Sequence, residues 1–431
     1  MYREIIQDSI DYIEDNLKCG ITADELSARA GFSLFHYYRL FQTAVGMPVM
    51  QYIVRRRLLN AIYEISCGSK MVDAALLYCF DTHAGFYKAF VRELGYTPSQ
   101  YLKKYKVKKP YRINIFEEEH IMVTHKKAKE ILKAWKLENE SISDIYYEET
   151  GNRNESAFYI GEDYVLKYSA NLGKLKSHIT ISKALEGVGL SAATVLQTCE
   201  GNEYVADGEL YFCLTKRLEG KQVKASEIYE GDTETKARFI GEIIGQLDNA
   251  LTGVEAVVNE TDIYEGVINW AMPKLKGKVH IPEKILQEYE QRFGTIVSLL
   301  PGQIIHRDPN PGNIILTEDK WGFIDFELSE KNVRIFDPCY AATAVLSESF
   351  EEGNETRLST WIKIYKNIIY GYDDVVKLTK EEKEAIPYVV LSNQLMALAW
   401  FAQTEKYRDL YETNKKMTEW ILEVFAELSL D

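Results

Sequence analysis

The chain has 431 residues, 46% of them hydrophobic and 27% charged, with a formal net charge of −14. It is too long for one ordinary core, and its composition is that of a soluble globular protein with several domains. No run approaches the roughly twenty apolar residues of a membrane span, and Met1–Glu4 open no apolar signal segment. The six cysteines form no Cys-x-x-Cys pair. We therefore expect reduced thiols, a cytoplasmic protein and no membrane partner.

Two short helices joined by a glycine are predicted near the start of the chain. Thr22 is placed to cap the first helix, with Glu25 as its capping-box partner three residues later. The helix runs to Gly31, whose freedom at positive φ permits a tight turn. Ser33 then caps a second helix over residues 34–41. Two helices around such a turn predict a helix-turn-helix unit.

A second unit of the same kind is predicted after a longer helix, which extends from about Val49 to Ser66. In the second unit, Thr82 caps a helix over residues 83–92. The long helix spans about 27 Å at 1.5 Å per residue. That length is close to the roughly 34 Å between successive major-groove faces on one side of B-DNA. Two recognition helices are therefore expected to enter adjacent grooves.

This arrangement resembles the DNA-binding domain of AraC-type regulators. The match covers residues 5–104 and includes His36 with Arg39–Phe41, Tyr52–Leu58, Gly85–Phe90 and Gly95–Tyr101. Cys79 departs from the family, which usually has Gly in the second turn, so we expect that turn to be strained or differently shaped. The resemblance implies a double-stranded DNA operator as partner and allows RNA polymerase as another.

The resemblance also implies which side chains contact DNA. Arg is suited to a bidentate contact with guanine, and a Ser or Thr at a helix start can bind a phosphate. Arg55–Arg57 are expected to lie partly on a solvated face. The expected DNA-binding residues are Ser33, Phe35, Tyr38 and Arg39 in the first unit and Thr82, His83 and Lys88 in the second.

Charge separates the two ends of the chain. Residues 1–110 hold fifteen Lys and Arg against eleven Asp and Glu, a net charge of +4, so the other residues carry −18. Binding of a polyanion is therefore plausible only at the first end. An acidic remainder suits a cationic small molecule, although acidity for solubility is the commoner explanation.

Strand composition appears after residue 140. A connector over residues 109–140, with a helix predicted at 123–136, leads to short runs at 144–147, 157–160 and 164–168, and then to a longer run at 211–218. Beyond about residue 230 the apolar spacing becomes helical, as in residues 239–247, 386–401 and 418–428.

The string Ile305-His306-Arg307-Asp308-Pro309-Asn310-Pro311-Gly312-Asn313 carries the clearest chemistry in the chain. Phosphoryl transfer needs a carboxylate beside the acceptor hydroxyl and hard oxygen ligands that hold Mg²⁺ on the phosphates. Asp308 is placed as the catalytic base. Asn313, across the Pro311-Gly312 turn, and Asp325, after the apolar run 321–324, are placed as metal ligands.

This string resembles the catalytic loop of the aminoglycoside phosphotransferase superfamily, which includes choline and homoserine kinases. The resemblance implies ATP or GTP and Mg as cofactors, and a structural role for Asp337. It places Lys167 on the phosphates and Asn152 in the nucleotide loop. Thr215 and Arg217 fall in the strap that binds adenine.

One position departs from that superfamily. The helix after Lys167 should carry a Glu that pairs with it, but His178 occupies this position. An uncharged imidazole would hold Lys167 less firmly than a carboxylate. Glu186, on a neighbouring turn, is the alternative partner.

The predicted fold is therefore multidomain. An all-α double helix-turn-helix domain (1–108) and the connector (109–140) precede an α+β bilobal kinase-like domain (141–431), with a small lobe at about 141–219 and a large lobe at about 220–431. Two functions follow. In the first, a DNA-binding transcription regulator senses a small molecule or nucleotide through its kinase-like domain. In the alternative, an active small-molecule O-phosphotransferase of aminoglycoside or aminoalcohol type carries a regulatory DNA-binding domain. The sequence leaves enzymatic activity undecided.

Overall fold

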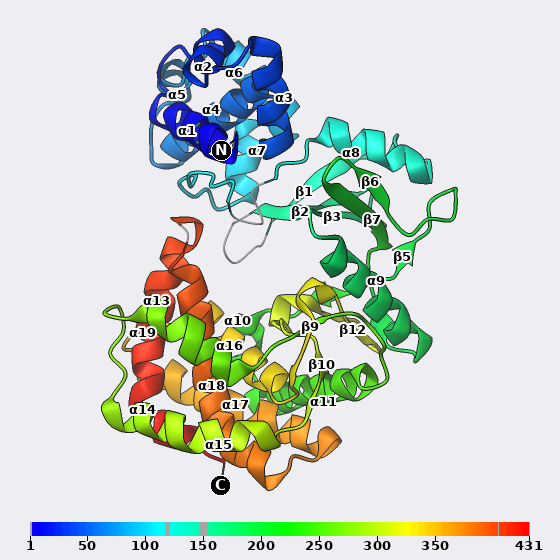
Figure 1. Ribbon diagram of the computed structural model, residues 1–431, viewed down its shortest axis with the longest axis vertical. Coiled ribbons are helices and arrows are strands. Elements are labelled where there is room, and N and C mark those ends of the chain that lie inside the picture. The colour runs from blue at the N-terminus through cyan, green and yellow to red at the C-terminus, as the bar shows by residue number, and fades with distance from the viewer. Residues whose placement is uncertain (1, 117–120, 147–152, 404, 431) are drawn as a thin grey trace. The chain divides into compact units, whose positions relative to one another are not determined.

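The computed structural model describes residues 2–116, 121–146, 153–403 and 405–430 (Figure 1). The chain divides into two compact units. The first contains Met1–Asn171 and Leu196–Arg217, and the second contains Leu172–Val195 and Leu218–Asp431. In the part of the chain that is described, no helix is both long and apolar enough to cross a membrane.

The first unit begins with a domain made only of helices, as the sequence predicts. Its core consists of aromatic side chains such as Phe41, Tyr52 and Phe90 and aliphatic side chains such as Leu26, all of which are fully buried. The helices are α1 (Tyr2–Asp15), α2 (Ala23–Arg29), α3 (Leu34–Val45), α4 (Val49–Ser66), α5 (Met71–Leu77), α6 (His83–Leu94) and α7 (Pro98–Lys104).

The predicted helix starts are confirmed, with one correction. The hydroxyls of Thr22, Ser33 and Thr82 each accept a hydrogen bond from the backbone N–H three residues later. Gly31 has a φ of 71°, as a tight turn requires. The capping box at Thr22 is only half formed, however, because the Glu25 carboxylate accepts a hydrogen bond from the Tyr12 hydroxyl instead. The hydrogen bond from Tyr12 of α1 therefore takes the place of the capping-box hydrogen bond between Glu25 and the backbone N–H of Thr22.

The connector packs back onto the helical domain. Ile113, Ile115 and Met122 are buried in the core of that domain. The backbone N–H of Met122 donates a hydrogen bond to the carbonyl of Val45 at 2.9 Å. The chain then forms α8 (His125–Leu132) and the 3₁₀ turn η1 (Lys133–Trp135), close to the predicted helix. Residues 117–120 are not among those described.

A six-stranded sheet forms the rest of the first unit. Its order is β1-β2-β3-β7-β5, with β6 also paired to β7. Phe158, Leu166 and Phe212 are fully buried in a core that also contains side chains of α8. The strands are β1 (Ile142–Tyr146), β2 (Arg153–Ile160), β3 (Tyr164–Ser169), β5 (Val195–Leu196), β6 (Val205–Asp207) and β7 (Leu210–Lys216).

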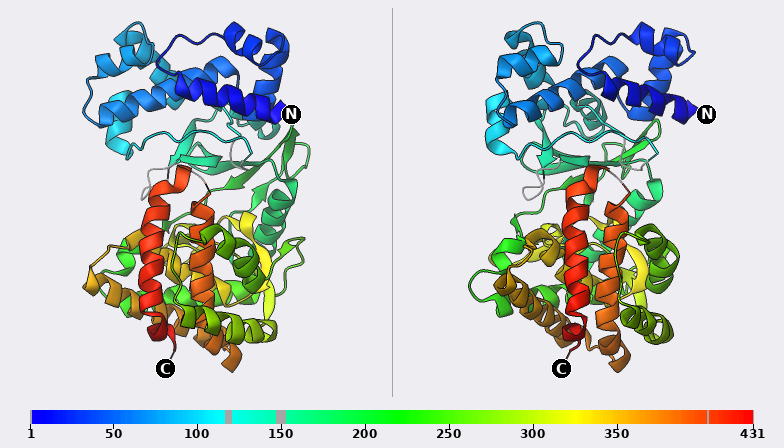
Figure 2. Two further views of the ribbon diagram at one scale, coloured as in Figure 1. Left: turned by 60° about the vertical axis from the view of Figure 1, so that its left-hand side comes forward. Right: turned by 90° about the vertical axis from the view of Figure 1, so that its left-hand side faces the viewer.

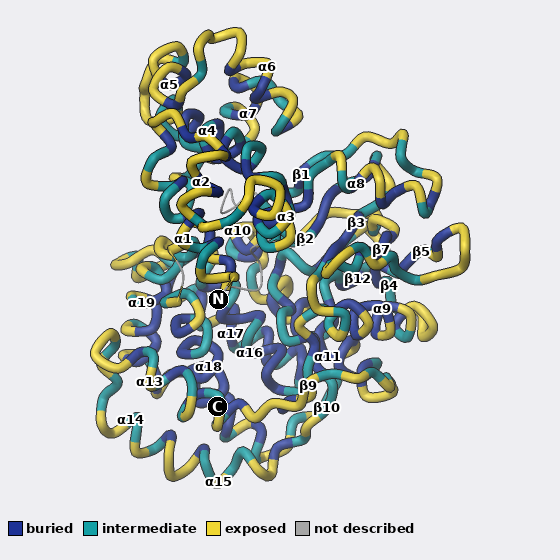
Figure 3. Tube along the Cα trace, turned by 45° about the horizontal axis from the view of Figure 1, so that its top comes forward, coloured by how far each residue is buried: buried dark blue, intermediate teal, exposed yellow. Residues whose placement is uncertain are grey.

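The second unit is mostly helical. Helices α18 and α19 run side by side (Figure 2), and most of α16 and α18 is buried (Figure 3). Its main helices are α9 (Leu172–Gly187), α10 (Ala225–Ile228), α11 (Thr233–Leu251), α12 (Ile263–Gly266), α13 (Met272–Leu275), α14 (Glu283–Glu288), α15 (Gly294–Ile296), α16 (Phe336–Ser349), α17 (Glu355–Val376), α18 (Lys380–Phe401) and α19 (Arg408–Glu423).

Two small sheets in this unit hold the predicted catalytic loop. One has the order β10-β13-β9 and the other β4-β12-β11-β8. The loop follows β10, contains the 3₁₀ turn η5 (Pro311–Asn313) and enters β11. The strands are β4 (Ser191–Ala192), β8 (Lys221–Gln222), β9 (Asn259–Glu260), β10 (Gly302–Ile305), β11 (Ile314–Leu316), β12 (Trp321–Phe323) and β13 (Glu330–Val333).

Candidate functional site

The predicted recognition helices α3 and α6 present their N-terminal ends to solvent. Their inner faces hold Tyr37 and Phe41 or Phe86 and Phe90, all fully buried. The opposite faces carry the predicted DNA contacts, of which Phe35 is 75% exposed. The exposed residues of the predicted set are Ser33, Phe35, Arg39, Thr82, His83 and Lys88, and Tyr38 is partly exposed.

The three consecutive arginines of α4 serve the domain itself, so the expected solvated face is wrong for two of them. Arg55 and Arg56 are buried. The Arg56 guanidinium forms an ion pair with Glu14, at 2.6 and 2.9 Å, and donates to the carbonyl of Tyr111. Arg57 donates to two carbonyls in the segment after α1. These charges therefore tie α4 to α1 and to the connector.

Cys79 marks the expected strain in the second helix-turn-helix unit. Its φ is 63°, in the left-handed region. A residue with a Cβ pays about 1–2 kcal/mol there, whereas Gly does not. The prediction of a strained turn is thus confirmed.

Asp308 lies in a buried polar pocket of the catalytic loop. Its carboxylate accepts hydrogen bonds from Asn310 Nδ2 at 2.8 Å and Asn313 Nδ2 at 3.2 Å, and also hydrogen bonds with Tyr340. Burial, with a smaller contribution from the charge of Asp325, raises the pKa of Asp308 to about 6. A carboxylate with a pKa near 6 is a better general base near neutral pH than an ordinary Asp.

Asp337 braces the catalytic loop, in agreement with the structural role predicted for it. Its two carboxylate oxygens accept the backbone N–H groups of His306 and Arg307, at 2.8 and 2.9 Å. Arg307 has a φ of 76°, a strained conformation for a residue with a side chain. Its guanidinium pairs with Glu330 at 2.8 Å and lies over the ring of Phe336. These contacts hold the strained residue next to Asp308.

The two predicted metal ligands flank this loop. Asn313 is the last residue of the η5 turn, and because its Nδ2 donates to Asp308, its Oδ1 is directed away from that carboxylate. Asp325 has a φ of 71° at the end of β12. An amide oxygen and a carboxylate fit Mg²⁺, which usually takes only one or two carboxylates and fills its shell with water and phosphate oxygens. Among the described residues, no three His, Cys, Asp or Glu side chains form a metal-binding group.

His178 is fully buried in α9 and contacts the segment that follows Asp325. Its Nδ1 accepts a hydrogen bond from the backbone N–H of Phe326 at 3.4 Å, and the two rings stack. The Glu186 carboxylate accepts the backbone N–H of Ala192 at 2.9 Å, on the chain just after α9. Both side chains therefore bind backbone groups within the second compact unit.

The predicted nucleotide residues of the small lobe lie on neighbouring strands. Lys167 is buried in β3, opposite Ala157 of β2 and Cys213 of β7. Thr215 is buried in β7 opposite Val165. The backbone N–H of Arg217 donates to the Asp163 carbonyl, and its guanidinium lies over the Tyr159 ring. Asn152 lies outside the described residues.

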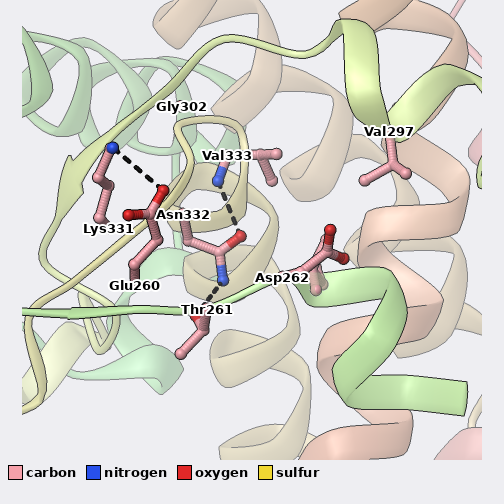
Figure 4. Close-up of a pocket in the computed structure, with 9 residues that line it drawn as sticks. Glu260, Thr261, Asp262, Val297, Gly302, Lys331, Asn332 and Val333 are labelled. Atoms are coloured by element: carbon pink, nitrogen blue, oxygen red, sulfur yellow. Dashed lines mark hydrogen bonds and ion pairs between the residues drawn. The ribbon is translucent and has the colours of Figure 1, made fainter. Parts of the chain in front are cut away.

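A cavity of about 120 Å³ lies in the large lobe, beside the strand pair β10–β13 (Figure 4). It adjoins Gly302 and Val333, which pair at one end of these strands, whereas the catalytic loop follows Ile305 at the other end. Its polar groups are already used: Lys331 pairs with Glu260, and Asn332 binds Thr261. Ligand pockets usually measure about 300–1,000 Å³, so this cavity does not contribute to the candidate site.

Three residues of the site were not predicted. Asn310 and Tyr340 bind the Asp308 carboxylate, and Asp248 of α11 is buried close enough to Asp337 for the charge of that carboxylate to raise its pKa. Asn310 lies within the catalytic string, two residues after Asp308, so its position was a usable signal. Asp248 is far away in the sequence, inside a helix with an ordinary amphipathic pattern, and gave no such signal.

Comparison with known proteins identifies both halves of the chain. The helix-turn-helix domain family matches residues 26–104, and the phosphotransferase enzyme family matches residues 150–363. The HTH-type transcriptional activator AarP of Providencia stuartii is 37% identical over 98 residues, which are 22% of this chain and 73% of AarP. The right origin-binding protein of Escherichia coli (strain K12) is 29% identical over 153 residues, which are 33% of this chain and 53% of that protein. This chain thus spans about half the length of the latter.

Solved structures resemble the C-terminal part in fold. A microcompartment-associated aminopropanol kinase aligns with a TM-score of 0.54 and 14% identity, over 70% of this chain and 98% of the kinase. Amicoumacin kinase hAmiN, in complex with AMP-PNP, Ca²⁺ and Ami, aligns with a TM-score of 0.52 and 14% identity, over 68% of this chain and 92% of the kinase. At this identity the likeness concerns the fold alone.

Proposed function

Because this chain belongs to the AraC-type helix-turn-helix family and also carries a phosphotransferase-family domain, we propose that it is a transcription regulator whose kinase-like domain acts as a sensor. The sensor binds ATP or GTP with Mg²⁺ and a small molecule. The observation that carries the regulatory function is the exposure of Arg39 on α3 and of His83 and Lys88 on α6, two helices whose inner faces are fully buried. Exposed side chains of this kind on a recognition helix support contact with base edges in a major groove.

His178 favours a sensor over an enzyme. In kinases, a Glu on this helix holds the phosphate-binding Lys in the active arrangement. Here the imidazole is used on the backbone of Phe326, and it offers Lys167 no negative charge. Nucleotide binding needs the nucleotide loop, Lys167 and the metal ligands Asn313 and Asp325. Fast phosphoryl transfer also needs the lysine to be held in the active arrangement. The missing carboxylate at position 178 is the feature that favours nucleotide binding with slow turnover in this proposal.

The ligand that we propose is a cationic small molecule. Residues outside 1–110 carry a net charge of −18, which attracts cations over a range limited by the Debye length. The two solved kinases with the same fold are named for aminopropanol and amicoumacin. An amine-bearing alcohol or antibiotic is therefore the first class to test.

The second candidate is an active small-molecule O-phosphotransferase with an attached regulatory domain. The environment of Asp308 favours it, since a pKa of about 6 suits a general base. In this mechanism Asp308 accepts the proton of the acceptor hydroxyl, while Asn310 and Tyr340 fix its carboxylate. Mg²⁺, when bound by Asn313 and Asp325, would neutralise charge on the phosphates.

Two measurements test these proposals. Operator sequences are first selected from random duplexes with the purified full chain, and binding is then titrated by mobility shift at fixed salt. Failure to select any sequence would overturn the regulatory function. ATP turnover is then measured with Mg²⁺ across aminoglycosides, macrolides and aminoalcohols, with Asp308→Asn as the control.

The two outcomes of the turnover assay separate the candidates. Turnover that is lost in Asp308→Asn establishes a phosphotransferase. Binding of Mg·ATP by calorimetry without turnover supports the sensor. Asp325→Ala should abolish the Mg²⁺-dependent part of nucleotide binding, and retained Mg·ATP affinity would contradict the assignment of Asp325.

A further inference from the structure

The helix-turn-helix domain and the kinase-like small lobe meet at one polar, aromatic junction within the first unit. Tyr146, the last residue of β1, packs against the core of the helical domain. Its ring stacks on Tyr105, with centroids 3.8 Å apart, and its hydroxyl lies 3.1 Å from that of Tyr101. Tyr101 belongs to α7, and Tyr105 follows directly as its C-cap. The C-terminal end of α7 thus packs against β1, the edge strand of the sheet.

Two further contacts make the junction specific. The Tyr111 hydroxyl, in the connector, donates a hydrogen bond to the Glu155 carboxylate of β2. Beside it, buried Asp144 of β1 accepts hydrogen bonds from Arg153 at 3.0 Å and from His125 at 3.3 Å. Buried ionic groups of this kind tolerate little displacement, because a charge that loses its partner inside a protein is costly.

The charge of α4 contributes to the same cluster. Burial alone would raise the pKa of Asp144, but the charge of Arg153, the hydrogen bond from His125 and the charge of Arg55 hold it well below its usual range. Arg55 is 6% exposed. The long helix between the two helix-turn-helix units therefore contributes a buried charge to the lobe that follows.

Strand β2 links this junction to the predicted phosphate lysine. Glu155 is two residues from Ala157, and Ala157 lies directly opposite Lys167 of β3. The residue after Lys167, Tyr168, is buried within range of the charges of Arg153, Glu155 and Arg55. A shift of β2 against β3 that accompanies nucleotide binding would therefore change the fit at Tyr146 and Glu155.

We propose that this junction, formed by Tyr101, Tyr105 and Tyr111 on one side and Tyr146 and Glu155 on the other, couples nucleotide binding by the small lobe to operator binding by the helix-turn-helix domain. The inference rests on the proposed function, since both ligands must bind. Mg·ATP changes operator affinity because it favours one arrangement of the junction over another. The operator changes Mg·ATP affinity by the same factor.

The test compares operator affinity with and without saturating Mg·AMP-PNP, an analogue that excludes turnover. For the wild-type chain we expect a change of about 5-fold to 150-fold, the usual range of coupling between two sites. In Tyr146→Ala this ratio should approach 1, while the affinity for each ligand alone stays close to the wild-type value. Tyr204→Ala is the matched control, because its ring pairs with Tyr211 inside the same lobe, and it should keep the wild-type ratio.

A conservative variant guards against misfolding. The double substitution Tyr101→Phe, Tyr111→Phe keeps every ring and removes only hydroxyl contacts at the junction. It should lower the ratio by at least several-fold.

Each outcome has a distinct meaning. A wild-type ratio of 1 with both ligands bound overturns the coupling but leaves the proposed function intact, as does a ratio unchanged in both junction variants. If the wild-type chain binds no nucleotide or no operator, the proposed function is overturned, and the coupling with it. An equal factor for the operator's effect on Mg·AMP-PNP affinity supports the coupling.

Discussion

The backbone N–H of Phe326 donates a hydrogen bond to Nδ1 of His178, 148 positions earlier in the chain, at 3.4 Å. The contact joins α9 to the residue that follows Asp325. In protein kinases a Glu of the αC helix pairs with the lysine that binds the phosphates. Here an uncharged acceptor holds the backbone beside a predicted metal ligand.

His178→Ala should therefore destabilise the second compact unit. The substitution leaves a buried N–H without its acceptor and opens a cavity, at a cost of about 1–3 kcal/mol for the unpaired group. His178→Asn keeps an acceptor near the position of Nδ1 and should lose clearly less. Chemical unfolding, followed by Trp fluorescence, gives both values, and Mg·ATP affinity should fall in the same order. Equal losses in the two variants would contradict a role for this hydrogen bond.

Arg39→Ala should weaken binding to the selected operator by about 1–3 kcal/mol and relax preference at one base pair, as expected for loss of a bidentate base contact. Arg39 is exposed on α3. Arg3 on α1 is also exposed and serves as the control, since Arg3→Ala removes the same charge at a residue outside the predicted DNA-binding set. Mobility shifts at fixed salt measure both. Unchanged operator affinity in Arg39→Ala would remove Arg39 from the DNA-binding set.

The carboxyl pair Asp248 and Asp337 should make stability depend on pH. Burial raises the pKa of Asp248 well above its usual range and that of Asp337 to about 7, although hydrogen bonds from His306 and Arg307 oppose the second shift. Unfolded aspartates titrate near 4. The stabilising contribution of the bound proton is thus complete below about pH 4 and is lost as the pH rises through about 7.

Asp248→Asn keeps a donor near Asp337 but does not titrate. Relative to this variant, the wild-type chain should lose stability between pH 5 and pH 8, by at most about 1.4 kcal/mol per pH unit for each proton. Thermal melts across this range measure the difference. Asp373→Asn is the opposite control. Burial raises the pKa of Asp373, but the hydrogen bonds from Lys383 and Leu378 and the charges of Lys383 and Lys377 together outweigh it and lower that pKa. A difference between wild type and Asp248→Asn that is constant with pH would contradict the raised pKa of Asp248.

Cys79→Gly should stabilise the second helix-turn-helix unit. Relief of the left-handed backbone contributes about 1–2 kcal/mol, and the greater freedom of Gly in the unfolded chain subtracts about 0.5–1 kcal/mol. Cys67 has a φ of −83°, so Cys67→Gly relieves no strain. It only adds the entropy cost of Gly in the unfolded chain, and it should destabilise the domain. Hydrogen exchange of the α5 and α6 amides reports the local stability. Faster exchange in Cys79→Gly would show that the thiol makes contacts worth more than the strain.

The sequence predicted those features that depend on neighbouring residues. The caps at Thr22, Ser33 and Thr82, the turn at Gly31 and the strain at Cys79 each involve groups within a few positions of one another. The catalytic string likewise places Asp308 and Asn313 within one turn. Local geometry fixes such contacts, so pattern and spacing are enough to find them.

Contacts between distant segments were not predictable in the same way. Burial of Arg56 depends on Glu14, 42 positions away, and the Glu25 carboxylate turned to Tyr12 in another helix. The polar face expected for Arg55 and Arg56 was wrong because the connector and the small lobe cover it. A single sequence gives the period of a helix but does not identify the surface that its polar side meets.

The burial of Ile113, Ile115 and Met122 sets how long a chain segment must be to transfer the helix-turn-helix domain intact to another protein. The matched helix-turn-helix family ends at residue 104, yet a transplant cut there would leave the helical core without three of its apolar side chains. Recombination that keeps the buried residues of this core must carry the chain at least through Met122. The segment that must be exchanged as a unit is therefore longer than the matched motif at residues 26–104. Its last part, up to Met122, is also the part of the chain that leads into the small lobe.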